Sequence, residues 1–329
     1  MKINYPILCT FLVIPVIASA QVFDKKDPLA HTFSIVARDP DTGEMGVAVQ
    51  SHWFSVGTAV SWAEAGVGAV ATQSFVNKSF GIRGLALMKS GLNAQEALDS
   101  LLSDDPGRDV RQVALVDSRG NVAVHTGKSC IQFASHITGD QFSVQANMML
   151  GGQVPASMAK AFMGSRGKSL AERMLLALEA GQASGGDIRG KQSAAILVVP
   201  AKGEGKPWDE RTTDLRVDDH ANPIREIRRL YLVGVAYDHM NKGDLAIENN
   251  DMPGAMKEYN AAMKMFPENL EMQYWTAVTL ANNGETGKAI PMFRMIFAKD
   301  RNWKELTRRL PAVKLLSVPD AELKKIMAL

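Results

Sequence analysis

The sequence predicts an α+β protein: a four-layer αββα sandwich, with two sheets between two helical layers, followed by a small all-α domain. Three observations predict this. Up to about residue 225, short β-rich apolar blocks are interrupted by helical signals. Their order, strands and then two helices and then strands again, suits two antiparallel sheets packed together with helices outside. Beyond residue 225 the pattern becomes helical, with a 34-residue period.

The first residues are typical of a secretory signal. Lys2 precedes the apolar stretch Tyr5–Ile17, and Ala18-Ser19-Ala20 fits the small-x-small cleavage pattern. The stretch is shorter than the ~20 residues of an ordinary membrane span. Cys9 lies within it but lacks a lipoprotein box. We therefore expect a signal peptide over residues 1–20 and a secreted or periplasmic protein without a membrane anchor.

Composition and motifs exclude several classes of function. Formal net charge is +2, with Lys and Arg spread along the chain, whereas nucleic-acid binding calls for a concentrated basic face. Cys130 is the one cysteine beyond the signal peptide, so we expect no intrachain disulfide and no thiolate zinc cluster. Gly66-Val67-Gly68 lacks the Lys-Ser/Thr of a phosphate loop. We predict no nucleic-acid partner and no cofactor.

Histidines and acidic residues do not form a metal motif. His52, His125 and His136 have no spacing characteristic of a metal site. Asp218-Asp219-His220 is more typical of a solvated loop before a helix. No Gly-x-Ser-x-Gly elbow is present for a Ser–His–Asp mechanism. We therefore predict no metal.

The strand pattern begins with a hairpin. Thr32–Ala37 and Met45–Ser51 flank Asp39-Pro40-Asp41-Thr42-Gly43, whose residues favour a tight turn. Further strands are expected over Ala59–Trp62, Ala69–Ser74, Val113–Val116, Val122–His125, Phe142–Met148, Ala194–Val199 and Thr213–Val217.

Helical signals separate these strands. Gly84–Ser90 is followed by Asn93, which starts a second helix with Glu96 three positions later. Ser169 and Glu172 have the same capping-box spacing. The helices therefore fall in two groups, as the sandwich requires.

The chain beyond residue 225 is different in kind. Pro223 begins a helix, and small and aromatic residues then recur after 34 positions: Ala255, Tyr259 and Ala262 as Ala289, Phe293 and Ile296. This spacing resembles that of tetratricopeptide repeats, whose small residues let paired helices approach closely. Such repeats imply a protein partner or self-association.

Thr32 is the leading candidate for catalysis. A Thr at a newly made chain end can act as nucleophile, with its own α-amine as base. Free α-amines titrate near ~7.7–8.0, close to operating pH. Thr32 is equally compatible with a plain structural role, because β-branched residues favour strands. The catalytic interpretation requires a cut between His31 and Thr32.

Several blocks resemble a known family. They are Thr32–Pro40, Gly46–Ser51, Gly66–Gln73, Gly185–Ala195 and Asp214–His220. Together they resemble the bacterial family catalogued as domain of unknown function 1028, placed in the N-terminal-nucleophile (Ntn) hydrolase superfamily, over roughly residues 31 to 229. The resemblance implies the αββα sandwich and, by superfamily analogy, hydrolysis of an amide bond.

The sequence departs from the family pattern in the residues that precede Thr32. In typical members the Thr follows the initiator Met, whereas here Gln21–His31 would remain in front of Thr32 after signal cleavage. Ntn hydrolases often make such a cut themselves. The predicted division is a signal peptide over 1–20, a leader or propeptide over 21–31, an Ntn-hydrolase-like domain over 32–225 and tetratricopeptide-like repeats over 226–329.

Other site candidates lie at strand ends and in one loop. Ser34 shares a strand face with Thr32, and Ser51 ends the neighbouring strand, where it would shuttle a proton or orient substrate. Asn147 would donate to an oxyanion. In the Gly185–Ser193 loop, an Asp would hold an amine and an Arg would bind a carboxylate. The expected catalytic residues are Thr32, Ser51 and Asn147; the expected substrate-binding residues are Ser34, Gln50, Gln73, Asp187, Arg189 and Gln192.

Two functions remain open on the sequence. The first is an exported Ntn amidohydrolase that acts on a small or peptide-like amide. The second is a non-catalytic binding protein that keeps Thr32 internal and uses the sandwich and repeats to hold a peptide or protein partner.

Overall fold

The computed structural model describes residues 29–329. The predicted signal peptide, residues 1–20, and the leader up to residue 28 therefore lie outside the described residues. The described chain forms two compact units, one ending at Pro223 and the other spanning Ile224–Leu329.

The first unit contains two antiparallel sheets. The six-stranded sheet has the order β11 (Thr213–Val217), β10 (Ser193–Val199), β3 (Met45–Ser51), β2 (Thr32–Arg38), β9 (Phe142–Ala146), β8 (Ser135–Gly139). The five-stranded sheet has the order β1 (Leu29–Ala30), β5 (Gly68–Phe75), β6 (Arg111–Asp117), β7 (Val122–Thr126), and β4 (Ser61–Glu64) also pairs with β5. The prediction of an α+β chain with two antiparallel sheets and a helical C-terminal region is thereby confirmed.

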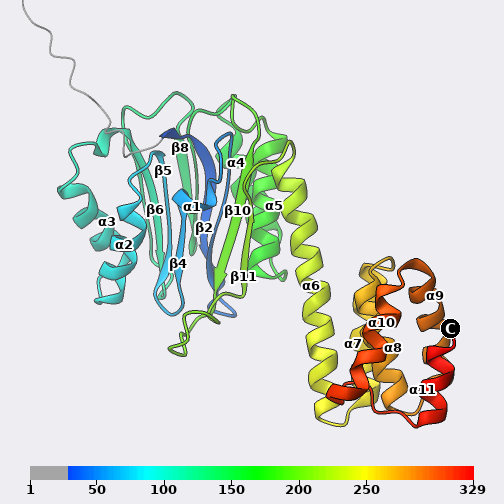
Figure 1. Ribbon diagram of the computed structural model, residues 1–329. Coiled ribbons are helices and arrows are strands. Elements are labelled where there is room, and N and C mark those ends of the chain that lie inside the picture. The colour runs from blue at the N-terminus through cyan, green and yellow to red at the C-terminus, as the bar shows by residue number, and fades with distance from the viewer. Residues whose placement is uncertain (1–28) are drawn as a thin grey trace, which may run out of the picture. The chain divides into compact units, whose positions relative to one another are not determined.

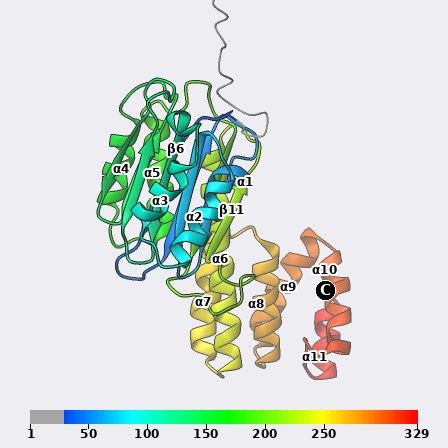
Figure 2. The ribbon, with the colours of Figure 1, turned by 90° about the vertical axis from the view of Figure 1, so that its left-hand side faces the viewer.

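Helices flank the two sheets (Figures 1 and 2). In Figure 1, α2 and α3 lie beside the five-stranded sheet, and α4 and α5 lie beside the six-stranded one. Buried apolar side chains such as Val36, Val49 and Ala114 fill the space between the sheets. The helices of this unit are α1 (Gly57–Val60), α2 (Ser79–Lys89), α3 (Ala94–Ser103), α4 (Val154–Gly164) and α5 (Leu170–Ala183), with a short 3₁₀ helix at Arg108–Val110.

The predicted hairpin is confirmed. β2 pairs with β3 so that Thr32 lies opposite Ser51. In the connecting turn, Oδ1 of Asp39 accepts hydrogen bonds from the main-chain nitrogens of Asp41 (2.9 Å) and Thr42 (3.1 Å). This is how a short polar side chain stabilises a tight turn. Because β9 and β10 pair with the outer edges of the hairpin, its register is fixed from both sides.

Two parts of the strand prediction are wrong. Ala59–Trp62 is not one strand, because α1 ends at Val60 and β4 begins at Ser61. A short apolar run has the same pattern in a buried helical turn as in a strand. The strands β1 and β8 were not predicted. β8 is exposed along most of its length, so it lacks the alternation of buried and exposed residues that identifies a strand.

The second unit is helical. Its elements are α6 (Pro223–Glu248), α7 (Met252–Met265), α8 (Leu270–Asn282), α9 (Thr286–Lys299), α10 (Asn302–Arg309), a 3₁₀ helix at Leu310–Val313 and α11 (Asp320–Met327). The side chains at all six positions of the 34-residue period are buried: Ala255, Tyr259, Ala262, Ala289, Phe293 and Ile296. A Cβ added to Gly243 would overlap the ring of Tyr259. The small residue at 243 therefore allows α6 and α7 to pack closely.

Candidate active site at the start of β2

The bond between His31 and Thr32 lies where the chain passes from one sheet to the other. Ala30 in β1 pairs with Ser74 of the five-stranded sheet. Two residues later, Thr32 opens β2 in the six-stranded sheet and pairs with Ser51. His31 is 1% exposed and Thr32 is fully buried. The predicted cleavage site is thus enclosed within the described structure.

Two donors converge on the main-chain oxygen of His31. Ser51 Oγ donates to it at 2.6 Å, and Arg189 Nη2 donates to it at 2.7 Å. One donor is neutral and the other is a cation, and charge-assisted hydrogen bonds are the stronger kind. Preorganised donors on a carbonyl oxygen are what stabilises a tetrahedral intermediate in acyl transfer. The carbonyl polarised in this way belongs to the bond that precedes Thr32.

Asp187 positions Arg189. Its Oδ1 accepts from Arg189 Nε at 3.0 Å, and its Oδ2 accepts from Arg189 Nη2 at 2.7 Å. Oδ2 also accepts from the main-chain nitrogen of His52 at 3.1 Å. In the described chain, Asp187 therefore binds Arg189, and Arg189 binds a main-chain carbonyl oxygen. The expected binding of a substrate amine by Asp187 and of a substrate carboxylate by Arg189 stays a prediction.

Thr32 is held at both its side chain and its main chain. Its hydroxyl donates to the main-chain oxygen of Ala30 at 2.8 Å. Its carbonyl oxygen accepts from the main-chain nitrogen of Asn147 at 3.1 Å and from Gln73 Nε2 at 3.3 Å. Gln73 therefore contacts the candidate nucleophile directly.

Asn147 occupies the site in a different role from the one expected. Its Oδ1 lies 2.7 Å from His31 Nδ1, and its Nδ2 donates to Gln112 Oε1 at 2.9 Å. The donors on the His31 oxygen are instead Ser51 and Arg189. In the described chain, Asn147 thus contacts the side chain that precedes the candidate bond, and its expected role as an oxyanion donor stays a prediction.

Buried polar side chains between the sheets support this arrangement. Ser34 Oγ donates to Gln73 Oε1 at 2.7 Å and accepts from Gln145 Nε2 at 2.6 Å. Gln73 Nε2 donates to Gln112 Oε1 at 2.7 Å. Ser34 therefore supports Gln73 instead of contacting Thr32. Satisfied buried networks of this kind fix the geometry of their members.

Sequence reasoning missed three members of the site: His31, Gln112 and Gln145. The sequence places His31 in a departing leader, which gives its side chain no role. Gln112 and Gln145 lie in otherwise apolar strand blocks and are fully buried. A buried amide facing the inter-sheet core is the signal that could have identified them, but it requires knowing which strand faces oppose each other.

Two expected substrate-binding residues do not join the site through their side chains. Gln50 pairs with Phe33 and Ala194, so it points to the opposite sheet face from Thr32 and Ser51. Its buried amide has no hydrogen-bond partner among the described residues. Gln192 contributes its main-chain nitrogen, which donates to the Ser51 oxygen at 3.1 Å.

Burial keeps the His31 ring neutral. Desolvation, the largest influence, lowers the pKa of His31 from its ordinary value of 6.5, and the charge of Arg189 lowers it further. The hydrogen bond between His31 Nδ1 and Asn147 Oδ1 and the charge of Asp187 only partly oppose this. The site therefore favours the neutral form of the imidazole.

The part of the chain that the structure describes holds neither a metal-binding cluster nor a membrane-spanning helix. Over residues 29–329, no group of three or more His, Cys, Asp or Glu side chains is arranged to hold a metal ion. In the same residues, no helix combines the length and the apolar character needed to cross a membrane.

Comparison with known proteins identifies the family. The family of unknown function DUF1028 matches residues 32–227, which is more than half of the chain, so the protein belongs to that family. A crystal structure described as DUF1028, of a protein from Silicibacter pomeroyi, is 31% identical and has a TM-score of 0.55; the match covers 61% of this chain and 85% of that one.

A second similar structure is Anbu (ancestral beta-subunit) from Yersinia bercovieri. It is 11% identical, with a TM-score of 0.31, and the match covers 61% of this chain and 93% of that chain. Among curated proteins, none matches the chain.

Proposed function

We propose that the protein is an exported Ntn-type hydrolase that cleaves an amide bond of a small or peptide-like substrate. Thr32 is the nucleophile after cleavage between His31 and Thr32. The observation that carries this proposal is the pair of donors, Ser51 Oγ and Arg189 Nη2, on the main-chain oxygen of His31. Two sheets flanked by helices, and a family match that begins at Thr32, are consistent with it.

The first reaction is self-cleavage. Thr32 Oγ1 attacks the carbonyl carbon of His31, and the hydroxyl proton passes to the departing amide nitrogen of Thr32. Ser51 and Arg189 stabilise the negative oxygen of the tetrahedral intermediate. The C–N bond breaks and leaves an ester between the His31 acyl group and Thr32 Oγ1. Water hydrolyses this ester, which gives a leader with a carboxylate at His31 and a chain with a free amine at Thr32.

The second reaction repeats these steps on an external amide. The freed α-amine of Thr32 takes the hydroxyl proton as Oγ1 attacks the substrate carbonyl. The proton passes to the leaving amine, and water then hydrolyses the acyl ester. In this reaction Ser51 and Arg189 hold the substrate oxygen in the position that His31 oxygen occupies in the uncut chain.

Intact mass of the exported protein tests the proposal. A mature chain that begins at Thr32 is the expected result. Thr32→Ala should retain residues 21–31 and lack amidase activity, whereas the exposed control Thr58→Ala should be cleaved like the wild type. An active hydrolase that begins at Gln21 would rule out Thr32 as an N-terminal nucleophile.

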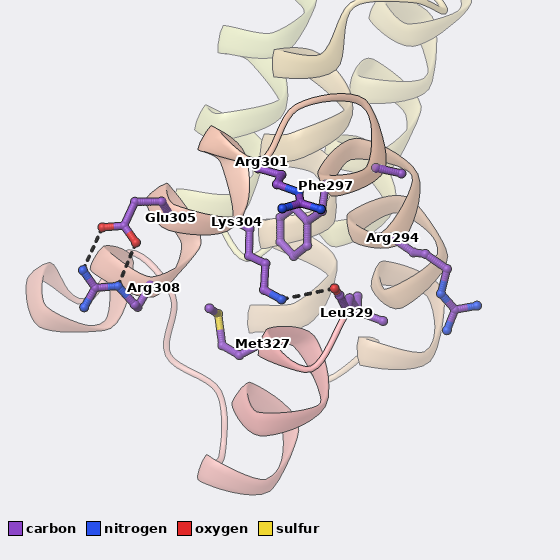
Figure 3. Close-up of a pocket in the computed structure, with 9 residues that line it drawn as sticks. Arg294, Phe297, Arg301, Lys304, Glu305, Arg308, Met327 and Leu329 are labelled. Carbon is purple, nitrogen blue, oxygen red and sulfur yellow. Dashed lines mark hydrogen bonds and ion pairs between the residues drawn. The ribbon is translucent and has the colours of Figure 1, made fainter.

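One observation favours a second candidate function, peptide binding by the tetratricopeptide-like unit. A pocket of about 730 Å³ lies in the helical unit (Figure 3). Ligand pockets typically have volumes of about 300–1,000 Å³. The pocket combines an apolar surface with four cationic side chains and one carboxylate; its lining residues are Arg294, Phe297, Ala298, Arg301, Lys304, Glu305, Arg308, Met327 and Leu329.

The charges of this pocket suit an acidic peptide. Glu305 is bound by Arg308 and Arg309, whose hydrogen bonds lower its pKa to about 2. Arg301 has no ion-pair partner among the described residues. Lys304 Nζ donates to the main-chain oxygen of Leu329 at 3.1 Å (Figure 3). In this pocket, the carboxylates of a peptide would therefore meet cationic side chains, and an apolar side chain would meet the apolar surface.

A labelled peptide of alternating Glu and Leu tests this candidate by fluorescence polarisation. We expect binding that weakens at high salt and is lost on the double change Arg301→Glu and Lys304→Glu. Lys257→Glu, an exposed change on α7, is the control. Equal binding by the double variant and the control would exclude this pocket as the peptide site.

A further inference from the structure

The His31 side chain is held by specific contacts beside the candidate bond. Nδ1 lies 2.7 Å from Asn147 Oδ1, and the ring meets Phe75 edge-on, with centroids 5.8 Å apart and planes at 89°. The residue is 1% exposed. A leader that served only as a spacer would need none of these contacts.

The surrounding amides fix the direction of the hydrogen bond to His31. Gln112 Nε2 faces the main-chain oxygens of Ala146 at 3.0 Å and Ser135 at 3.3 Å. Carbonyl oxygens only accept, so this atom is the donor nitrogen. Gln112 Oε1 therefore faces Asn147 Nδ2, and Asn147 Oδ1 is left facing His31. The His31 Nδ1 must donate.

The site also favours an uncharged side chain at position 31. Arg189 donates to the main-chain oxygen of His31, and its positive charge disfavours a protonated ring more than the nearby Asp187 carboxylate favours one. His31 Nε2 is buried and has no hydrogen-bond partner among the described residues. A protonated ring would place an unpaired N–H there, which is costly in a buried position. The position therefore suits a neutral planar group with one donor directed at Asn147.

The main chain of the leader indicates a second feature of the bound peptide, an extended conformation. Leu29 and Ala30 form a strand that pairs with Phe75 and Ser74 of β5. When the leader departs, this part of the β5 edge loses its partner. An extended peptide can pair with such an edge through main-chain hydrogen bonds.

We propose that these contacts form the acyl-side specificity site of the mature enzyme. Its substrates are peptide amides whose acyl residue carries a neutral, planar, hydrogen-bond-donating side chain such as imidazole. This inference rests on the proposed function. The ester formed in self-cleavage is the His31 acyl group on Thr32 Oγ1, and an external peptide amide with His at that position would form the same kind of ester. The groups that bind the leader acyl residue therefore bind the substrate acyl residue.

Self-cleavage rates of leader variants provide the first test. His31→Asn keeps a planar donor, whereas His31→Phe and His31→Leu leave Asn147 Oδ1 without one. We expect His31→Asn within about tenfold of wild type, and the Phe and Leu variants slower by about tenfold or more. Residue 31 leaves with the leader, so each cleaved variant yields the same mature chain. Equal activity per cleaved chain therefore controls for folding.

The mature wild-type enzyme provides the second test, with N-acetyl-Leu-Ala-His coumarylamide against the Leu-Ala-Phe and Leu-Ala-Leu analogues. We expect kcat/KM for the His probe to exceed that of both analogues by about tenfold or more. A wild-type chain that stays uncut, with Thr32 internal, would refute the proposed function. A chain that is cut, but shows no preference for His in processing or in the probes, would overturn the specificity site alone.

Discussion

At the residue scale, the carbonyl of His31 receives two hydrogen bonds of different kinds. Ser51 presents a hydroxyl from the end of β3, where the strand register fixes its position. Arg189 presents a guanidinium from a loop, and its position depends on two hydrogen bonds that it donates to the Asp187 carboxylate. Loss of Asp187 would therefore act through Arg189, whereas loss of Ser51 removes a donor directly.

Ser51→Ala should slow self-cleavage by about 10²–10³-fold, because it removes one of two preorganised donors from the developing oxyanion. The rate can be followed by intact mass after refolding from denaturant. Ser90→Ala, at an exposed serine, is the matched control. Unchanged kinetics in Ser51→Ala would show that the hydroxyl is not part of the reaction.

The low pKa of His31 predicts how stability depends on pH. At a pH well above the ordinary pKa of 6.5, the ring is neutral in both the folded and the unfolded chain. As pH falls below that value, the unfolded chain gains a proton that the folded chain does not, so the free energy of unfolding decreases. Urea titrations of uncleaved Thr32→Ala at pH 7.5 and pH 5.5 should show this loss. In Thr32→Ala with His31→Asn the loss should be smaller, and an equal loss would contradict the assignment.

Part of this site could be predicted from the sequence. The meeting of Thr32 and Ser51 follows from a turn of recognisable chemistry between two β-rich blocks. The partners of Arg189 and Asn147 could not be predicted, because they depend on how a loop and a strand end meet across the two sheets. Gln50 does not face Thr32, because neighbours in a strand point to opposite faces; of Gln50 and Ser51, it is Ser51 that shares the face of Thr32.

At the element scale, α6 carries two glycines in contrasting surroundings. A Cβ added to Gly243 would overlap the Tyr259 ring, whereas one added to Gly234 would meet no atom within 4 Å. The helix itself favours Ala over Gly at either position by about 0.5–1 kcal/mol. Packing against α7 therefore decides whether a change from Gly to Ala stabilises or destabilises the protein at position 243. At position 234, helix propensity decides it.

Gly243→Ala should lower the free energy of unfolding by about 1–3 kcal/mol, the usual cost of overpacking. Gly234→Ala, its matched control on the same helix, should leave stability unchanged or raise it slightly. Chemical denaturation followed by circular dichroism measures both. Similar stabilisation by the two changes would mean that residue 243 does not form the close contact described.

Elements with strong local signals were predicted best. The helix α3 begins at the expected capping box of Asn93 and Glu96, with both reciprocal hydrogen bonds present. The two-residue strand β1 could not be predicted, because it exists only through its pairing with β5. Edge strands of this kind are defined by their neighbours and not by their own composition.

At the scale of the whole molecule, the two compact units have separate hydrophobic cores. One core lies between the sheets and includes Val36 and Ala114. Another lies among the C-terminal helices and includes Tyr274 and Phe293. A unit with its own core can unfold on its own.

Calorimetry should therefore resolve two unfolding transitions, and Gly243→Ala should lower the midpoint of only one of them. Thr32→Ala, which keeps the leader attached, serves as a comparison. It should shift only the transition of the first unit, whose midpoint Gly243→Ala should leave unchanged. A single transition that shifts as a whole in both variants would show that the units unfold together.

The groups around His31 come from distant parts of the chain, and this separation determines when the cut can occur. Arg189 is 158 residues from the carbonyl that it binds, and Asn147 is 116 residues from the same His31. No short fragment contains the whole arrangement, and a nascent or extended chain holds the scissile bond without its donors. In the proposed reaction, the cut can therefore occur only once the first unit has folded. A free amine at Thr32 would therefore be present only in chains whose first unit has folded. A misfolded copy would remain an uncut, inactive precursor.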